Sequence, residues 1–100
     1  MTAILTGKIA LVTGGSYGIG QAIAEALAAS GALVAIAQHP DDANDAARVV
    51  AGIAAKGGQA FSIDAFLGPA GSAEALGERF IAALRERGET PALDILVNNV

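Results

Sequence analysis

Three glycines near the N-terminus have a spacing that suits the binding of a phosphate group. They are Gly14, Gly18 and Gly20, and they follow a short apolar segment. The first amides of a helix have no partner within the helix and lie at the positive end of its dipole. Glycines keep side chains away from such amides and allow a tight turn before them. The pattern therefore predicts a diphosphate site over residues 14–20.

The elements predicted around this turn are those that such a site requires. Residues 8–13 are apolar and bounded by glycine, which is typical of a strand buried on both faces. Ile19, Ile23 and Leu27 recur every four residues, so we expect a helix over residues 19–30 that packs Ile19 into the core. A strand-to-helix turn that binds nothing is the alternative interpretation of the glycines alone.

The rest of the chain alternates between predicted strands and helices, which indicates an α/β fold with a parallel sheet. Further strands are predicted over residues 33–38, 59–63 and 93–97, and further helices over residues 43–56 and between Ser72 and Gly88. The third strand is expected to be shorter and near the sheet edge. We expect Asp42 or Asn44 to cap the second helix and Ser72 to cap the third.

Two amides, Asn98 and Asn99, follow the last predicted strand. Right-handed crossovers and the Rossmann arrangement give the four strands the order 3-2-1-4, so the first and fourth strands are neighbours. Their carboxyl ends, which carry Thr13-Gly14 and Asn98-Asn99, then border one crevice, where such sheets bind ligands. The amides can also tie the two strands together, because buried polar groups need partners.

These two segments resemble motifs of the short-chain dehydrogenase/reductase family. Thr13 followed by Gly-x-x-x-Gly-x-Gly is similar to the family's cofactor motif, and residues 93–99 are similar to its strand that ends in Asn-Asn-Ala-Gly, with Val100 in place of the alanine. The resemblance implies a Rossmann-type doubly wound parallel sheet. Residues 1–100 are then expected to be the N-terminal part of one NAD(P)-binding domain, incomplete without the rest.

The resemblance implies hydride transfer between a nicotinamide cofactor and an alcohol or carbonyl substrate. The family's catalytic serine and Tyr-x-x-x-Lys pair have no match here, and Tyr17 and Lys8 do not replace them. No catalytic residue is therefore named, and residues 1–100 alone are expected to be inactive. Family members are commonly homodimers or homotetramers. The alternatives are a non-catalytic dinucleotide-binding or redox-sensing protein of the same fold, and a fragment without function.

Further cofactor positions follow the glycine turn. Ser16 either adds a hydroxyl hydrogen bond to the diphosphate or satisfies its own turn. By resemblance, the backbone of Ile19 runs beside the nicotinamide. Tyr17 stands where family members that prefer NADP often carry a basic residue. The acid that selects NAD at the end of the second strand is replaced by Gln38, and His39 follows it.

The neutral Gln38 favours NADP(H) over NAD(H), since it does not repel a 2′-phosphate. His39 either faces that phosphate or is a surface turn residue. By resemblance, Phe66-Leu67 occupies the adenine position after the third strand, where the family has Asp-Val, and Asn98 passes the adenosine ribose. Phe66 accepts no hydrogen bond, so adenine recognition would rest on backbone groups or apolar contact; Asp64 is not given this role.

Composition argues against several other classes. The net charge is −4 without a basic cluster, which argues against nucleic-acid binding. Without cysteine and with one histidine, neither a disulfide nor a metal site is expected. No apolar run is long enough to span a membrane, and no signal peptide is recognised, so we expect a cytoplasmic protein. No Gly-Lys-Ser/Thr follows the turn, which argues against a nucleoside triphosphatase.

Overall fold

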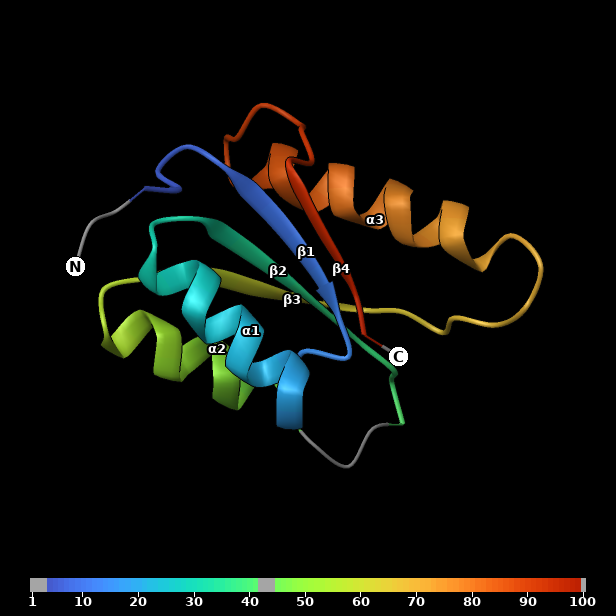
Figure 1. The fold of residues 1–100 in the computed structure, drawn as a ribbon. Coiled ribbons are helices and arrows are strands. Elements are labelled where there is room, and N and C mark those ends of the chain that lie inside the picture. Colours follow the sequence, from blue (N-terminus) through green and yellow to red (C-terminus); the bar gives the residue numbers. More distant parts are fainter. Residues whose placement is uncertain (1–3, 42–44, 100) are drawn as a thin grey trace.

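The computed structural model describes residues 4–41 and 45–99 as one four-stranded parallel sheet with three helices (Figure 1). The strands are β1 (Ile9–Thr13), β2 (Leu33–Gln38), β3 (Gln59–Asp64) and β4 (Ile95–Asn98). The helices are α1 (Gly18–Ala29), α2 (Ala46–Ala55) and α3 (Ser72–Glu86). The strand order is β3-β2-β1-β4 with every pair parallel, so the predicted fold class and order are confirmed.

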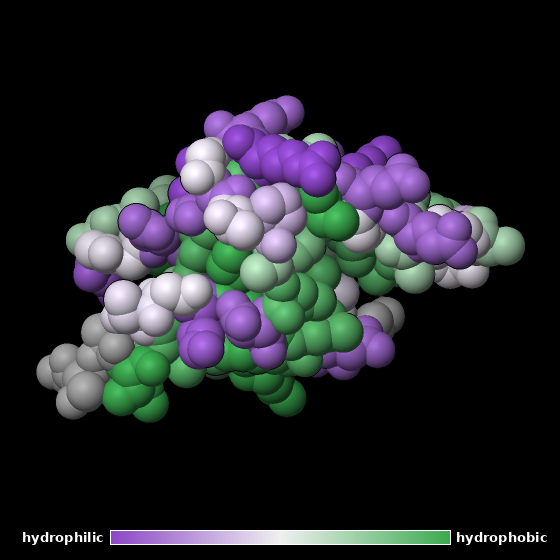
Figure 2. Space-filling model, turned by 90° about the horizontal axis from the view of Figure 1, so that it is seen from above, coloured by the Kyte–Doolittle hydropathy of each residue, from purple (hydrophilic) through white to green (hydrophobic). Residues whose placement is uncertain are grey.

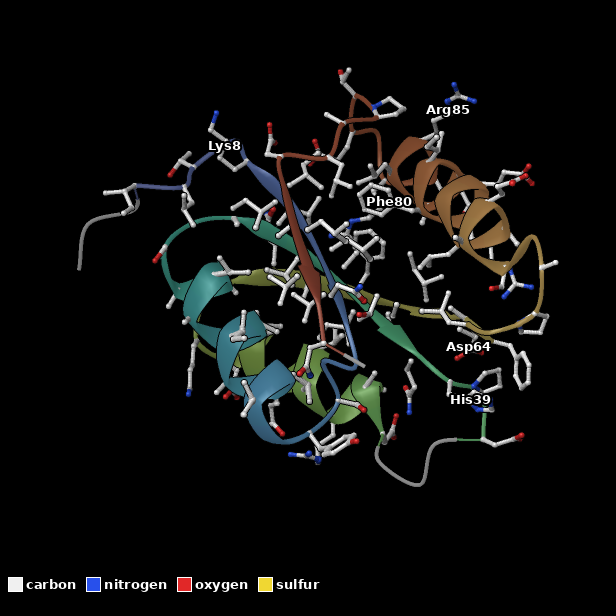
Figure 3. All side chains as sticks on the ribbon, turned by 45° about the vertical axis from the view of Figure 1, so that its right-hand side comes forward. Lys8, His39, Asp64, Phe80 and Arg85 are labelled. Carbon is white, nitrogen blue, oxygen red and sulfur yellow. The ribbon has the colours of Figure 1, made fainter. Side chains whose placement is uncertain are left out.

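Helices cover both faces of the sheet, α1 and α2 on one face and α3 on the other (Figure 1). Successive strand side chains alternate between these faces. On the α3 side the helix contributes three buried residues, Leu76, Phe80 and Leu84. Figure 3 shows Phe80 directed toward the sheet and Arg85 on the outer side of the helix. Because both faces are buried, β1 and β2 are apolar along almost their whole length.

Helix α1 buries small residues, contrary to the predicted isoleucine face. Its buried residues are Gly20, Ala24 and Ala28. The side chain of Ile19 is 74% exposed, so the expectation that it packs into the core was wrong. A helix face made of glycine and alanine lets the helix backbone lie close to the sheet, and the larger side chains then lie on the flanks of the contact.

The helix caps differ from the prediction in two places. The side chain of Asp45 accepts a hydrogen bond from the amide of Ala47 at 2.9 Å and caps α2; the expected caps Asp42 and Asn44 lie outside the described residues, as does Val100. Ser72 is the first residue of α3, and its hydroxyl accepts from the amide of Gly68 in the preceding loop at 3.1 Å. The prediction that Ser72 caps α3 was therefore wrong.

The two outer strands differ in how much of their surface is covered. β3 is an edge strand, as predicted, but with six residues it is not shorter than β1. β4 forms the other edge, where Leu93 and Leu96 are 46% and 58% exposed. Figure 2 shows green hydrophobic surface between hydrophilic groups on the face seen from above. In the described part of the chain, no helix has the length and apolar character needed to cross a bilayer.

Asp94 fixes the start of β4 against the start of β1. Its carboxylate accepts a hydrogen bond from the amide of Ile9 at 2.8 Å, and its own amide donates to the carbonyl of Ile9 at 2.9 Å. This pair sets the register in which Thr13 lies opposite Asn98 at the other end of the strands. This register therefore fixes the relative position of the two segments that were predicted to border the crevice.

We expect Leu84→Ala to lower the free energy of unfolding by about 2–5 kcal/mol, because it leaves a cavity beneath α3. Leu84 is fully buried, whereas Ile81 on the same helix is 40% exposed. The matched control Ile81→Ala should change stability by less than half as much. Urea unfolding of the longest natural polypeptide that contains residues 1–100 measures both, and equal losses would contradict the packing described for α3.

Candidate functional site

The hydroxyl of Thr13 joins the carboxyl ends of β1 and β4. It accepts a hydrogen bond from the amide of Asn99 at 3.0 Å. Its own proton has two acceptors within reach, the side-chain oxygen of Asn98 at 3.3 Å and the carbonyl of Val97 at 3.4 Å. Thr13 is buried, so these bonds are sheltered from water. The structure thus brings the first and last predicted motifs into direct contact.

The start of α1 is held against these strand ends by two glycines. The side-chain amide of Asn99 donates to the carbonyl of Gly14 at 3.2 Å. A Cβ on Gly20 would overlap that same carbonyl, and a Cβ on Gly14 would overlap the carbonyl of Asn99. Gly14 also has a φ of +66°, which favours glycine. These two glycines therefore serve contacts within the protein.

Gly18 differs from the other two glycines because it faces open space. A Cβ at Gly18 would meet no atom within 4 Å, and its φ is +58°. The N-cap residue Tyr17 makes no side-chain cap bond, and its side chain is 54% exposed. The N-cap side chain therefore does not occupy the first amides of α1. The residues at this mouth therefore fit a diphosphate group, whose oxygens could accept from those amides.

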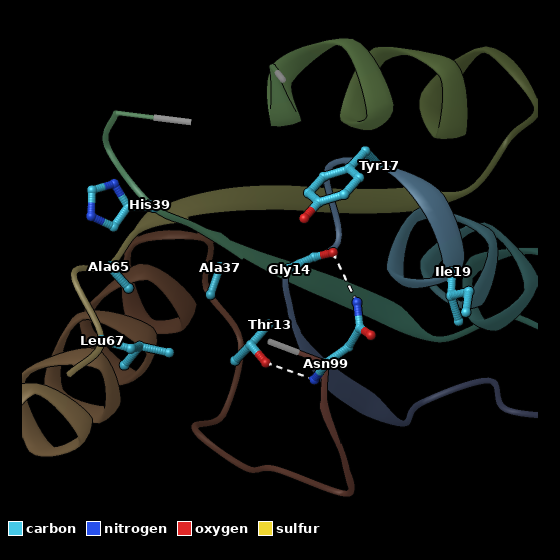
Figure 4. Close-up of a pocket in the computed structure, with 9 residues that line it drawn as sticks. All are labelled: Thr13, Gly14, Tyr17, Ile19, Ala37, His39, Ala65, Leu67 and Asn99. Atoms are coloured by element: carbon cyan, nitrogen blue, oxygen red, sulfur yellow. Dashed lines mark hydrogen bonds between the residues drawn. The ribbon is translucent and has the colours of Figure 1, made fainter. Parts of the chain in front are cut away.

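A cavity of about 370 Å³ lies beside this mouth, at the carboxyl edge of the sheet (Figure 4). Its lining combines the glycine turn with the ends of β2, β3 and β4: Thr13, Gly14, Tyr17, Ile19, Ala37, His39, Ala65, Leu67 and Asn99. Five predicted site residues are in this lining, namely Gly14, Tyr17, Ile19, His39 and Leu67. The others lie outside it, namely Ser16, Gly18, Gly20, Gln38, Phe66 and Asn98.

The exposed side chain of Ile19 is explained by this cavity. It stands on the first turn of α1 and forms part of the cavity wall (Figure 4). An exposed isoleucine in a wall of this kind offers an apolar surface to a flat ring.

The predicted site residue Ser16 is fully buried, so its side chain is not part of the cavity surface.

The amide of Gln38 connects β2 to α2. Its side-chain oxygen accepts a hydrogen bond from the amide of Ala46, the first residue of α2, at 2.9 Å. The carbonyl of Gln38 accepts from the amide of Ala65 at 2.8 Å, which fixes the segment that follows β3. Gln38 therefore positions two of the segments at the carboxyl edge of the sheet.

His39, which lines the cavity, forms an aromatic pair with Phe66, which is not part of the lining. Their ring centroids are 4.7 Å apart and the rings are tilted by 54°. The Nδ1 atom of His39 accepts a hydrogen bond from the amide of Asp41 at 3.0 Å, so a neutral ring carries its proton on Nε2. Phe66 is 56% exposed. The pair presents apolar ring surface and one N–H donor.

Sequence reasoning placed Thr13 and Asn99 at the crevice without naming them as cofactor residues, and it missed Ala37 and Ala65 in the cavity lining. Asn99 was grouped with Asn98 in the motif, but β4 ends at Asn98 and only the following residue can reach the glycine turn. Ala37 is the strand residue opposite Thr13. Ala65 follows β3 directly, and its hydrogen bond to Gln38 is a backbone contact that side-chain chemistry does not indicate.

Comparison with known proteins identifies the family. A family model for short chain dehydrogenases matches residues 8–100. An uncharacterized oxidoreductase of Methylorubrum extorquens is 45% identical over 95 residues, which are 95% of this chain and 36% of that protein. A 3-oxoacyl-[acyl-carrier-protein] reductase of Synechocystis is 39% identical over 99 residues, 99% of this chain and 37% of that protein.

Solved structures of similar proteins share the fold. The reductase LugOII of lugdunomycin biosynthesis has a TM-score of 0.91 and 47% identity over 99% of this chain and 40% of that chain. The landomycin C-6 ketoreductase LanV, solved with bound NADP and rabelomycin, has a TM-score of 0.89 and 49% identity over 97% of this chain and 39% of that chain. The chain thus spans about 40% or less of these relatives.

Gly20→Ala should lower the free energy of unfolding by about 1–3 kcal/mol, because the new methyl group must push α1 away from Gly14. Gly52→Ala in α2 is the matched control, since a Cβ there meets nothing within 4 Å and the change should stabilise the helix by about 0.5–1 kcal/mol. Urea unfolding of both variants measures the difference. Equal stability of the two variants would contradict the close contact of Gly20 with Gly14.

Proposed function

Because the chain belongs to the short-chain dehydrogenase family, we propose that the protein is an NAD(P)(H)-dependent oxidoreductase that transfers hydride between a nicotinamide cofactor and an alcohol or carbonyl substrate. The observation that carries the proposal is the start of α1, where the N-cap residue Tyr17 makes no side-chain cap bond, beside the joined ends of β1 and β4. Relatives named as reductases and ketoreductases favour this function over a non-catalytic dinucleotide-binding protein.

In this proposal the turn from Gly14 to Gly20 holds the diphosphate of the cofactor. Gly18 leaves the amides of α1 accessible, and Ser16 belongs to the same turn. Tyr17 and Ile19 border the cavity, with Ile19 beside the nicotinamide. The nicotinamide ring supplies the hydride chemistry, while the protein binds and orients it.

The adenosine end of the cofactor would lie toward the ends of β2 and β3. The rings of His39 and Phe66 and the side chain of Leu67 offer apolar contact for adenine, and the Nε2 proton of His39 offers a donor. Asn98 is exposed at the end of β4 and is proposed to pass the ribose. Gln38 acts by positioning α2.

NADP(H) is the proposed cofactor in preference to NAD(H). Gln38 ends β2 without a negative charge, so no carboxylate at this position repels a 2′-phosphate. Four related structures carry NADP. Two are of the ketoreductase LanV, one is the RhlG/NADP complex of Pseudomonas aeruginosa, and one is a 3-oxoacyl reductase from Agrobacterium tumefaciens. These observations support the preference for the phosphorylated cofactor.

Residues 1–100 supply the cofactor-binding part in this proposal, as one part of a longer NAD(P)-binding domain. None of their side chains is assigned a catalytic role, so activity is proposed for the whole protein and not for this part alone. We propose that the whole protein is cytoplasmic and that, by the family resemblance, it is a homodimer or homotetramer acting on a small alcohol or carbonyl compound. Loss of NADPH absorbance in the presence of small ketones tests the activity.

The charge at residue 18 tests the proposed diphosphate site. Asparagine and aspartate both tolerate the left-handed backbone conformation of Gly18 and have the same shape. Gly18→Asp places a carboxylate at the start of α1, where it stabilises the helix and repels a diphosphate. We expect it to bind NADPH at least about tenfold more weakly than Gly18→Asn, with equal or higher thermal stability.

Fluorescence titration of NADPH into both variants of the longest natural polypeptide that contains residues 1–100 makes this comparison. Gly18→Asn serves as the neutral control for any strain at this position. Equal NADPH affinity of the two variants would contradict binding of the diphosphate at the start of α1.

A further inference from the structure

We propose that Arg48 recognises the 2′-phosphate of NADP(H), an inference that rests on the proposed cofactor binding at the glycine turn. Arg48 is the third residue of α2 and lies far from the glycines in the sequence. In the structure, its Nη2 atom donates to the carbonyl of Ser16 at 3.4 Å and to the side-chain oxygen of Gln21 at 3.3 Å. The guanidinium group is therefore in contact with the turn that precedes α1.

Hydrogen bonds at the start of α2 hold Arg48 in this place. The side chain of Gln38 accepts from the amide of Ala46, which ties the helix to the end of β2. The side chain of Asp45 accepts from the amide of Ala47, and its carbonyl accepts from the amide of Arg48. These three amides have protein partners, so the part of this helix start that remains available to an anion is the arginine side chain.

The guanidinium group has the charge and the donors that a phosphate needs. Arg48 is exposed, and both of its acceptors are neutral. Among the described residues no carboxylate forms an ion pair with it. Both bonds use Nη2, which leaves the donors on Nε and Nη1 for a phosphate, and a guanidinium can bind phosphate through two parallel hydrogen bonds. The side chain is thus a cation held by weak neutral contacts.

Arg48 supplies the positive charge that the glycine turn itself lacks. Tyr17 stands where the resemblance leads one to expect a basic residue, and its side chain is neutral and lines the cavity. Ser16, whose carbonyl contacts Arg48, directly precedes Tyr17 in the sequence. A positive charge is therefore supplied to the same turn from α2, on a different element from the one that the motif indicates.

The other basic side chains are less suited to this role. Lys8 lies at the opposite end of the sheet from His39 (Figure 3). Lys56 is the C-cap residue of α2, at the other end of that helix from Arg48. Arg79 on α3 donates to the carbonyl of Asp64 at 2.6 Å, and Arg85 points away from the sheet (Figure 3). Arg87 lies over the ring of Phe61, 5.0 Å from its centroid. Arg48 is the basic residue whose side chain contacts the glycine turn in the described part of the chain.

The test compares ligands that differ by the 2′-phosphate alone. Wild type, Arg48→Gln, Arg48→Lys and Arg85→Gln of the longest natural polypeptide that contains residues 1–100 are titrated by calorimetry. The ligand pairs are NADPH with NADH, and adenosine 2′,5′-bisphosphate with adenosine 5′-monophosphate. Arg48→Gln should weaken NADPH and the bisphosphate by about 10- to 100-fold, the range for a lost charged hydrogen bond, and leave NADH and the monophosphate within about twofold.

The two controls separate charge from fold. Arg48→Lys should keep part of the discrimination, because it keeps the charge but loses the paired donors. Arg85→Gln, on the outer side of α3, should bind all four ligands as wild type does. The wild-type preference for NADPH should fall as salt is added, since the interaction is between exposed charges.

The unfavourable outcomes are distinguishable. If Arg48→Gln weakens NADPH and NADH equally, Arg48 only supports the turn, and this inference is overturned while the proposed function stands. The same holds if Arg48→Gln changes neither affinity. If wild type binds neither dinucleotide, the proposed function itself fails, and the role of Arg48 fails with it.

Discussion

The contact of Gly14 with Gly20 and Asn99 is the constraint on which the rest of the site depends. The end of β1, the first turn of α1 and the residue after β4 meet there, and two of the three residues have no side chain. The side-chain amide of Asn99 donates to the carbonyl of Gly14, and the backbone amide of Asn99 donates to the hydroxyl of Thr13. The strand ends and the helix start are thus fixed together by hydrogen bonds in a place too crowded for any Cβ. The direction of α1, and hence of its free amides, follows from this contact.

The glycines of the turn consequently have two separate physical roles. Gly14 and Gly20 allow close contact within the protein, whereas Gly18 takes a left-handed conformation and leaves the mouth of the helix open. Glycine loses more conformational freedom on folding than other residues, at a cost of roughly 0.5–1 kcal/mol each. At Gly14 and Gly20 that cost is offset by packing of α1 against the strand ends. At Gly18 nothing packs within 4 Å in the described structure, and its left-handed φ of +58° is itself a conformation that favours glycine.

Periodicity predicted the strands, helices and strand order because both faces of a parallel sheet are apolar and its crossovers have one hand. The prediction from periodicity that Ile19 is buried was wrong. It followed the spacing of the large apolar residues, whereas the face of α1 that packs on the sheet is made of glycine and alanine. The prediction that Ser72 caps α3 was wrong because its hydroxyl accepts a hydrogen bond from the amide of Gly68 in the preceding loop. The contacts of Asn99 with Gly14 and of Arg48 with Ser16 could not be found by local patterns, because these partners lie 85 and 32 residues apart in the chain. Such contacts depend on register and on helix placement, which the sequence encodes only through the whole fold.

Gln38 shows why the end of β2 acts as a unit with α2. In dinucleotide folds, residue type at this position is interpreted through charge, with an acid favouring the free ribose hydroxyl. Here the neutral amide also accepts from the first amide of α2, while its backbone carbonyl holds Ala65. A carboxylate could accept the same bond from Ala46, but it would bring a negative charge to the helix start that carries Arg48. The neutral Gln38 and the cation on α2 therefore both favour the proposed NADP(H). Gln38 does not repel its 2′-phosphate, and Arg48 would attract it. In the proposed site, selectivity for the 2′-phosphate would therefore depend on the β2–α2 connection as a whole and not only on the residue that ends the strand.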